Sequence, residues 1–391
     1  MKRLVWPGMD MRMERSVWSS MEMRMKRLVG SGMDMRIEIP VWPGMVSQYS
    51  FVGFFVRNKK HANKMSFVSF CGCKDYLDQR WCMKSCSSSQ RITVLVLRYL
   101  KAGWRNYIED AASYRMFNDH RGQWTLERNK CNLLVWSLNC PFDESVLLWH
   151  IATDFCFYSG AFPGHKCTFY KANSIWWQLQ NEIASAQGKS LPSPQSSSQC
   201  GEMTCCKAVQ CRQMSNYMMY LLFVNPDMLL PGSRRNLFTT AYDELKGILE
   251  DKKLAAPMEG SAGTRQANKP PTEEKEVIQS IITKLHSTHG SEKEGFIHDA
   301  WSLAQGLLAL GDEERMWEVI EGVWVEMLCF SAGRCRGYLH AKALGTGGEL
   351  LTYIWLTLSY MGMETLAEKL QRTDLPSSGG NTRAATGADI V

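Results

Sequence analysis

The sequence predicts a mainly α-helical protein, and three observations predict this fold class. First, apolar residues in the last third of the chain recur at alternating steps of four and three, which places each series on one face of an α-helix. The two series are Phe296, Ala300, Leu303, Leu307 and Leu310, and then Met316, Ile320, Val323, Met327 and Phe330. Second, Gly311 and Asp312 lie between the series, where glycine favours the end of one helix and aspartate the start of the next. Third, apolar runs of helical length, separated by prolines and polar stretches, recur between residues 91 and 249.

The chain begins with a 12-residue repeat that fills residues 1–48 in four copies, the first of which reads MKRLVWPGMDMR. A period of 12 fits neither a 3.5- nor a 3.6-residue apolar stripe over four copies. We therefore predict a disordered, low-complexity tail at the amino terminus. The alternative is a binding repeat that uses the methionines and tryptophans of this stretch.

Residues 49–250 are predicted to form a helical region. Tyr49–Val56 is an apolar run followed by basic residues, which is typical of the cytoplasmic end of a membrane helix, but it is too short to span a bilayer alone. Arg91–Gly103 fits a strand by its β-branched residues and a helix by its surroundings. The other segments that we expect to be helical are Gln123–Leu138, Pro141–Tyr158, Ile175–Ala186, Met214–Leu222 and Leu237–Leu249. Residues 188–199 are rich in proline and serine and are expected to form a loop.

Residues 251–294 are polar, contain three prolines and are predicted to be a linker. After this linker, residues 295–371 are predicted to form a carboxy-terminal module of three helices. Its first two helices form an αα-hairpin whose apolar stripes meet, and the third covers Leu350–Leu358. Gly345–Gly348 is expected to stop one helix and start the next, because the lysine of a phosphate-binding loop is missing from it. Residues 372–391 are predicted to be disordered.

The charge is unevenly distributed along the chain. Residues 49–130 contain 15 basic and 6 acidic residues, whereas residues 291–330 contain 2 basic and 9 acidic residues. The two regions could attract each other, or the basic region could face phosphate groups of lipid or nucleic acid. The simplest alternative is two solvated surfaces of opposite sign. No DNA- or RNA-binding module accompanies the basic region, so nucleic acid is not an expected partner.

Fourteen cysteines are present, but no apolar secretory segment precedes them and no Asn-X-Ser/Thr site occurs in the chain. We therefore expect a reducing compartment, in which most cysteines act as small hydrophobic residues. One cluster supplies the four thiolates that a tetrahedral zinc site needs, although its spacing differs from the usual C-x2-C pairs. This cluster consists of Cys71, Cys73, Cys82 and Cys86. A second cluster, for which zinc and palmitoylation are alternatives to simple burial, consists of Cys200, Cys205, Cys206 and Cys211.

Several polar residues lie on or beside the apolar helices of the carboxy-terminal module. They are His298, Asp299, Glu318, Glu321, Glu326 and His340. Carboxylates and histidines together can bind metal or perform acid–base chemistry, so one hypothesis is a hydrolase that uses His298, Glu326 and His340. The alternative is that these groups cap a buried turn or pair with Arg315, Arg334, Arg336 and Lys342. No HExxH motif, nucleophile elbow or kinase motif is present, so the sequence predicts no catalytic residue, cofactor or small-molecule substrate.

Seven short motifs in combination resemble a known family. They are PFDESVLLWHIATD (141–154), SNYMMYLL (215–222), NPDMLLP (225–231), DAWSLA (299–304), MWEVIEGVWVEM (316–327), HAKAL (340–344) and GGELLT (347–352). The chain is similar, from about Thr93 to Gln371, to plant proteins expanded in grasses that carry a carboxy-terminal domain of unknown function 594. Typical members also have an amino-terminal domain of unknown function 4220, which contains several membrane helices.

This sequence departs from the family pattern before residue 90, where the repeat and a short apolar run replace the membrane helices. The departure indicates a truncated member. The resemblance implies a membrane-associated, cytosol-facing protein, with a cytoplasmic protein as the alternative, and it implies no activity. We therefore expect a non-enzymatic helical interaction or scaffold protein that binds a protein partner through the carboxy-terminal module. A metal-binding protein that uses the first cysteine cluster and the hydrolase are the alternatives.

Overall fold

The structure is a computed structural model, and it describes the chain in eight segments. These are residues 46–60, 84–86, 89–159, 202–234, 236–250, 274–287, 295–345 and 348–371. The fold is mainly α-helical, as predicted. Among the described residues, strands occur only as β1 (Val46–Gln48) and β2 (Lys84–Cys86), which pair antiparallel with Val46 opposite Cys86.

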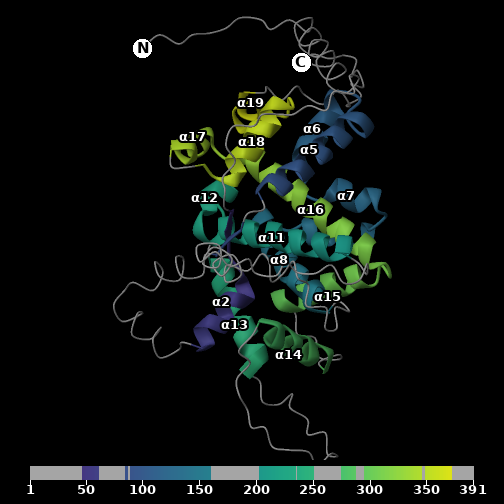
Figure 1. Cartoon of the computed structure of the whole chain (residues 1–391), viewed down its shortest axis with the longest axis vertical. Coiled ribbons are helices and arrows are strands. Elements are labelled where there is room, and N and C mark those ends of the chain that lie inside the picture. The colour runs from purple at the N-terminus through teal and green to yellow at the C-terminus, as the bar shows by residue number, and fades with distance from the viewer. Residues whose placement is uncertain are drawn as a thin grey trace, which may run out of the picture.

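The helices fall into two groups along the chain. The first group is α2 (Phe51–Lys60), α5 (Ser89–Asn106), α6 (Ala111–Asp119), α7 (Gln123–Arg128), the 3-10 helix η1 (Asn132–Leu138) and α8 (Phe142–Ser159). The second group is α11 (Glu202–Val224), α12 (Pro226–Leu229), α13 (Asn236–Glu250), α14 (Glu274–Ser287), α15 (Phe296–Leu308), α16 (Glu313–Arg334), α17 (Gly337–Gly345), α18 (Leu350–Tyr360) and α19 (Leu366–Gln371). Figure 1 shows α5, α6 and α17 to α19 at one end of the molecule and α2, α13 and α14 at the other.

Helix α8 is the centre of the core, because it is apolar around most of its circumference and is buried along most of its length. It packs against α11 and α15. Its buried polar side chains His150 and Asp154 form hydrogen bonds inside the core, although Asp154 Oδ2 has no hydrogen-bond partner there. His150 Nε2 accepts a hydrogen bond from the backbone N–H of Phe51, 3.1 Å away, and His150 Nδ1 lies 2.8 Å from Ser215 Oγ. Arg212 Nε donates to Asp154 Oδ1 over 2.8 Å.

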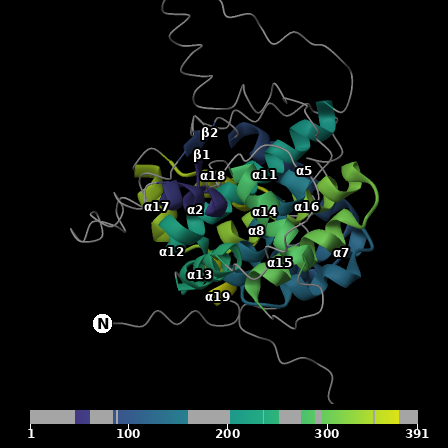
Figure 2. The same cartoon turned by 90° about the horizontal axis from the view of Figure 1, so that it is seen from below.

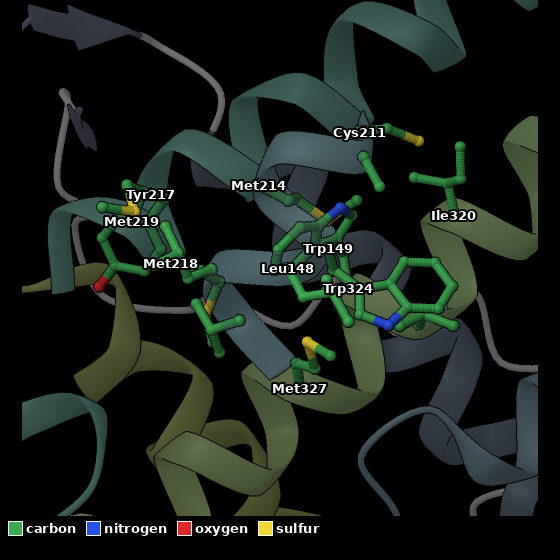
Figure 3. Packing of buried hydrophobic residues seen from close by; sticks show 14 of the residues in the cluster. Leu148, Trp149, Cys211, Met214, Tyr217, Met218, Met219, Ile320, Trp324 and Met327 are labelled. Carbon is green, nitrogen blue, oxygen red and sulfur yellow. The ribbon is translucent and has the colours of Figure 1, made fainter. Parts of the chain in front are cut away.

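The predicted boundary between the two helices of the hairpin is confirmed. Gly311 has a φ of 74°, and the Asp312 side chain accepts a hydrogen bond from the backbone N–H of Glu314 at the start of α16. The predicted packing of the hairpin is wrong, however. Helix α15 packs mainly on α8, and α16 packs mainly on α11 and α18. Figure 3 shows Ile320 and Trp324 of α16 gathered with side chains of α8 and α11 in this core.

The predicted linker contains a helix. Residues Glu274–Ser287 form α14, because their apolar side chains line one face and are buried against α8, α2 and α13. These side chains are Val277, Ile278, Ile281 and Leu285. Figure 2 shows α14 in front of α8 in the view from below. The carboxy-terminal module also has five helices, α15 to α19, where three were predicted.

The predicted helix Gln123–Leu138 is in fact two elements, α7 and η1, joined by a tight turn. Lys130 adopts a φ of 55°, and the N–H groups of Lys130 and Cys131 donate to the carbonyls of Glu127 and Leu126. This pattern is a Schellman turn, in which the left-handed position is usually glycine. After the turn, Leu133 and Trp136 lie three residues apart on η1 and are exposed. The ambiguous segment Arg91–Gly103 lies within helix α5.

The apolar run at Tyr49–Val56 lies in the core. Aromatic rings of this run, from Tyr49 and Phe54, contact Phe223 of α11 and Phe238 of α13. None of the described helices combines the length and hydropathy that crossing a bilayer requires. Residues 1–45, the predicted helix at 175–186, the loop at 188–199 and the tail at 372–391 lie outside the described residues.

Candidate functional site: a polar seam between two groups of helices

A line of polar contacts joins the middle helices α6 and α7 to the carboxy-terminal helices. We call it the polar seam. Its residues are Asn118, Asp119, Gly122 and Thr125 on the middle helices, and Glu326, Arg334, Glu364 and Lys369 on the carboxy-terminal helices. Two of the residues that the sequence analysis named, Glu326 and Arg334, belong to the polar seam.

Glu326 of α16 is fully buried and caps the first turn of α7 from another helix. Its Oε2 accepts a hydrogen bond from the backbone N–H of Gly122 over 2.6 Å, and its Oε1 accepts from the backbone N–H of Thr125 over 2.7 Å. The Thr125 hydroxyl donates to the same Oε1 over 2.6 Å. The first N–H groups of a helix have no partner within it, so this carboxylate satisfies donors that would otherwise be buried without an acceptor.

Two glycines allow this close approach. Gly122 has a φ of 129°, and a Cβ on it would lie 2.8 Å from a methyl carbon of Leu138. A Cβ on Gly322 of α16 would lie 2.6 Å from the Thr125 side chain. Any larger residue at either position would push α7 away from α16, which would lengthen the hydrogen bonds to Glu326.

The environment of Glu326 favours its neutral form. Burial raises the pKa of Glu326 to about 7, against the lowering effect of the hydrogen bonds from Thr125 and Gly122 and of the Arg128 charge. The Glu326 charge also acts on two tyrosines. Burial and then the charge of Glu326 raise the pKa of Tyr99 of α5, and burial, the charge of Glu127 and the charge of Glu326 raise that of Tyr107, which directly follows α5. Perturbed acids often mark functional sites, but structural networks perturb them as well. The three hydrogen bonds to backbone and threonine identify Glu326 as a helix cap.

Asp119, at the end of α6, forms the second contact of the seam. Arg334 of α16 and Lys369 of α19 both form ion pairs with its Oδ1. Burial raises the pKa of Asp119, but the hydrogen bonds from Lys369 and Arg334 lower it more, so that the pKa lies below its ordinary value. Beside this pair, the backbone N–H of Glu364 donates to Asn118 Oδ1 over 3.0 Å. These contacts hold α6 against the end of α16 and against α19.

At α18 the roles are reversed, because a side chain of the middle helix α11 caps the start of a carboxy-terminal helix. The Tyr217 hydroxyl, from α11, donates to Glu349 Oε1 over 2.9 Å and accepts the backbone N–H of Leu351 over 2.9 Å. Glu349 is itself the N-cap residue of α18 and accepts the N–H of Leu350. Burial raises the pKa of both Glu349 and Tyr217. The carboxy-terminal helices therefore cap the middle helices at α7 and are capped by them at α18.

A small pocket lies beside the seam, between α5, α6, α16 and the residues after α18. Its volume of about 10 Å³ holds about one water molecule, which is far too little for a metabolite. Its lining includes His120, Asn118 and Cys329. Burial lowers the pKa of His120 to about 4 and raises that of Cys329, so both are neutral at pH 7. The pocket is therefore lined by partly buried groups and has room for about one water molecule.

The structure does not bring His298, Glu326 and His340 together. His298 Nδ1 lies 3.5 Å from Glu244 Oε1 on α13. Both ring nitrogens of His340 are occupied, Nδ1 by Thr352 Oγ1 at 3.1 Å and Nε2 by the carbonyl of Ala332 at 3.3 Å. Because a carbonyl only accepts, Nε2 carries the proton, and burial lowers the pKa of His340 to about 4.

The other charged residues that the sequence singled out on α16 lie on or near its surface. Exposed Glu318 forms an ion pair with Lys207 of α11 over 3.3 Å, and Lys207 lies 3.9 Å from Glu314. Glu321 is half-buried; burial raises its pKa, while the charges of Lys207 and Arg98 lower it. The Arg315 guanidinium donates to the carbonyl of Asn129 over 2.8 Å. A surface ion pair and a backbone contact thus account for Glu318 and Arg315.

Most of the clustered cysteines cannot be compared with the sequence prediction. Cys71, Cys73, Cys82 and Cys200 lie outside the described residues, and only the backbone of Cys86, Cys205 and Cys206 is described. Cys211 is buried, and its Sγ lies 3.6 Å from the carbonyl of Trp317, as expected of a small core residue. Within the described part of the chain, no three His, Cys, Asp or Glu side chains are grouped closely enough to bind a metal ion.

Sequence reasoning missed the partners of Glu326 and the whole cap at α18. Thr125 lies 201 residues before Glu326, so no local pattern relates them. The cap at α18 did leave a signal, because an acidic residue, Glu349, directly precedes an apolar helical run. Tyr217 lies within an apolar motif and had no such signal.

The comparisons with known proteins identify one segment of the chain. The sequence model of a family described as a protein of unknown function, DUF594, matches residues 310–363. No curated protein matches the chain, and no solved structure matches it. The matched segment runs from the turn before α16 to the residues after α18, and so it contains Glu326, Arg334, His340 and Glu349. The carboxy-terminal part of the predicted resemblance is therefore confirmed, and residues 310–363 of this chain are similar to DUF594.

Proposed function

We propose that this protein is a non-enzymatic interaction or scaffold protein, which binds a helical protein partner through its carboxy-terminal module. One observation carries the proposal. In the segment similar to DUF594, Glu326 and Glu349 cap helices, Arg334 forms an ion pair and His340 forms hydrogen bonds, whereas four large apolar side chains remain exposed. Those side chains are Tyr338 (60 % exposed), Leu344 (47 %), Leu356 (38 %) and Tyr360 (58 %). We call these four residues the α17–α18 surface.

The α17–α18 surface belongs to two helices that pack on each other. Leu356 and Tyr360 lie four residues apart and therefore on one side of α18. Exposed apolar residues that cluster on neighbouring helices are typical of sites that bind the apolar face of a partner helix. The opposite side of α18, with Leu351, Ile354 and Leu358, is buried in the core, so the exposed side is available without unfolding.

Proximity labelling with the whole chain as bait tests this proposal in plant tissue, the setting that the resemblance implies. We expect a set of labelled proteins that is lost when the α17–α18 surface is changed by Leu356→Ser and Tyr360→Ser. The matched control is Met116→Ser with Leu133→Ser, because these residues are also exposed and apolar but lie on α6 and η1. The proposal is wrong if the labelled set survives the first pair of changes, or if both pairs remove it equally.

Membrane association on the cytosolic side is also part of the proposal, with a cytoplasmic protein as the alternative. It rests on the resemblance to plant proteins that carry an amino-terminal domain of unknown function 4220. Cell fractionation with a carbonate wash of the membrane pellet tests it. Protein that stays with the washed pellet supports the proposal, and protein found only in the supernatant removes it.

A zinc-binding role for Cys71, Cys73, Cys82 and Cys86 is the second candidate, because their sequence spacing supplies four thiolates. Metal analysis of the purified protein tests it, and a zinc content far below one atom per chain ends it. A hydrolase that uses His298, Glu326 and His340 gains no support from the geometry, because each residue has different partners.

A further inference from the structure

Helix α5 carries a line of positive charge on its exposed side. The exposed residues recur at steps of three and four, so they lie on one face, and the opposite face with Ile92, Val96 and Leu100 is buried. The exposed residues are Arg91, Val94, Arg98, Lys101 and Arg105. No aspartate or glutamate occurs in this helix. We call the four basic residues the α5 line.

Three of the four charges in the α5 line are only weakly neutralised by the rest of the described chain. No carboxylate of a described residue lies within ion-pair distance of Arg98, Lys101 or Arg105. The Arg98 charge, together with that of Lys207, lowers the pKa of Glu321 of α16, although burial raises that pKa more. The like charges of Arg98, Lys101 and Arg105 repel each other along the helix, so an anionic partner would stabilise this arrangement.

We propose that the α5 line binds an acidic helix of a partner protein, an inference that rests on the proposed role as an interaction protein. From Arg91 to Arg105 the helix rises about 21 Å, and successive charges on it are seven, three and four residues apart, or about 10, 5 and 6 Å along the axis. An acidic helix with carboxylates at steps of seven, three and four would place one carboxylate near each basic residue. Val94 lies within the line and would contact an apolar residue of such a helix.

The helix that carries the α5 line also packs beside one of the two helices of the α17–α18 surface. Helix α5 packs beside α18, and the Trp104 indole N–H donates to the carbonyl of Met361 directly after α18. One helical partner could therefore bury apolar residues on α18 and place its acidic residues along α5. Rim charges of this kind contribute more to the rate and specificity of association than to affinity.

Two other anionic partners fit the α5 line less well. A bilayer is flat, and it would also meet Glu109 and Asp110, which are exposed directly after α5 and would be repelled by anionic lipid. Single-stranded nucleic acid binds on exposed aromatic rings that stack with bases, and the exposed face of α5 has none. A narrow acidic helix avoids the flanking acids and needs no aromatic platform.

Binding of a designed peptide to the whole chain tests the inference. The probe is a fluorescent, 21-residue alanine-based helix with four glutamates at steps of seven, three and four, and its control peptide has the same composition with the glutamates scattered around the helix. Binding is measured by fluorescence anisotropy at low and high salt. Neither peptide has a large apolar side chain, so the result does not depend on the α17–α18 surface, and failure here would leave that proposal standing.

The matched variants remove equal charge from different places. One is Arg98→Gln, Lys101→Gln and Arg105→Gln, and the other is Lys130→Gln, Lys246→Gln and Arg336→Gln, all three of which are exposed elsewhere. We expect the first variant to weaken binding of the patterned peptide about tenfold, and the second less than twofold. Circular dichroism checks that both variants fold. If the first variant does not fold, the single change Lys101→Glu takes its place.

Three results would overturn the inference. They are equal binding of the patterned and scattered peptides, equal losses in the two variants, and no measurable binding of the patterned peptide at low salt. Vesicles of phosphatidylcholine with phosphatidylserine, and a thymidine oligonucleotide, are measured in parallel. If the vesicles or the oligonucleotide bind more tightly than the patterned peptide, and the first variant weakens that binding about tenfold as well, an acidic helix is not the partner.

Discussion

Replacing Glu326 with glutamine is expected to remove a pH dependence that the wild-type fold has between about pH 4.5 and 7. Burial raises the pKa of Glu326 from 4.5 to about 7, so in this window the folded protein holds a proton that the unfolded chain releases. The contribution of Glu326 to stability is therefore fully present below about pH 4.5 and is lost as the pH rises through the folded pKa. The difference between the unfolded pKa of 4.5 and the folded pKa of about 7, at 1.36 kcal/mol per pKa unit, corresponds to a loss of about 3 kcal/mol of unfolding free energy.

The glutamine side chain has the same shape as the carboxyl group but does not ionise. The carboxylate accepts two backbone N–H groups, from Gly122 and Thr125, and glutamine has one oxygen for both. One N–H group then faces an amide NH2 and loses its acceptor, which costs about 1–3 kcal/mol at every pH. In the wild type at low pH, the Thr125 hydroxyl can turn and accept the proton of the neutral carboxyl group, so both N–H groups keep their acceptors.

We therefore expect the variant to be less stable than the wild type by about 1–3 kcal/mol at pH 5, and this difference to disappear or reverse at pH 8. Urea unfolding at pH 5, 6, 7 and 8, followed by tryptophan fluorescence and circular dichroism, measures it. Glu318→Gln is the control, because Glu318 is an exposed glutamate on the same helix and its removal should leave the pH profile unchanged. A difference between Glu326→Gln and the wild type that stays constant from pH 5 to 8 would refute the reasoning.

Three further predictions concern stability. Lys130→Gly should raise the unfolding free energy by about 0.5–1 kcal/mol, because glycine adopts the observed φ of 55° without strain; a lower melting temperature would contradict this. Gly322→Val should cost about 2–3 kcal/mol in urea unfolding, because its Cβ would lie 2.6 Å from an α7 side chain, whereas Gly247→Ala, with open space around it, should be neutral or stabilising. Arg212→Ala should cost about 3–5 kcal/mol, because it leaves the buried Asp154 carboxylate unpaired, and a second change, Asp154→Leu, should restore much of the loss.

The helices with regular apolar stripes could be predicted from sequence, because the information is local. Ile320, Val323 and Met327 of α16 are fully buried, as their spacing indicates. The local sequence does not show which helix an apolar stripe packs against, because any apolar stripe can pack on any other. For this reason the pairing of α15 with α16 was wrong, and the apolar stripe of α14 was overlooked between polar and proline-rich neighbours.

The candidate site was predictable only in part, for a related reason. Glu326 stood out as an acid in an apolar helix, and one of the alternatives weighed for it, the cap of a buried turn, is what the structure shows. The capped helix α7 has only six residues, which is too short to produce a periodic pattern. The Schellman turn at Lys130 was missed because glycine, its usual signal, is absent.

The reciprocal caps decide how this protein can be divided for experiments. A clone that encodes only residues 310–363, or only 295–371, would lack α7, α8 and α11. Trp324, Ile320 and Met327 would then face solvent, and the amide of Leu351 would lose the hydroxyl that it bonds to. Such a fragment would be prone to aggregate, so expression clones and binding studies should retain at least α5 to α19.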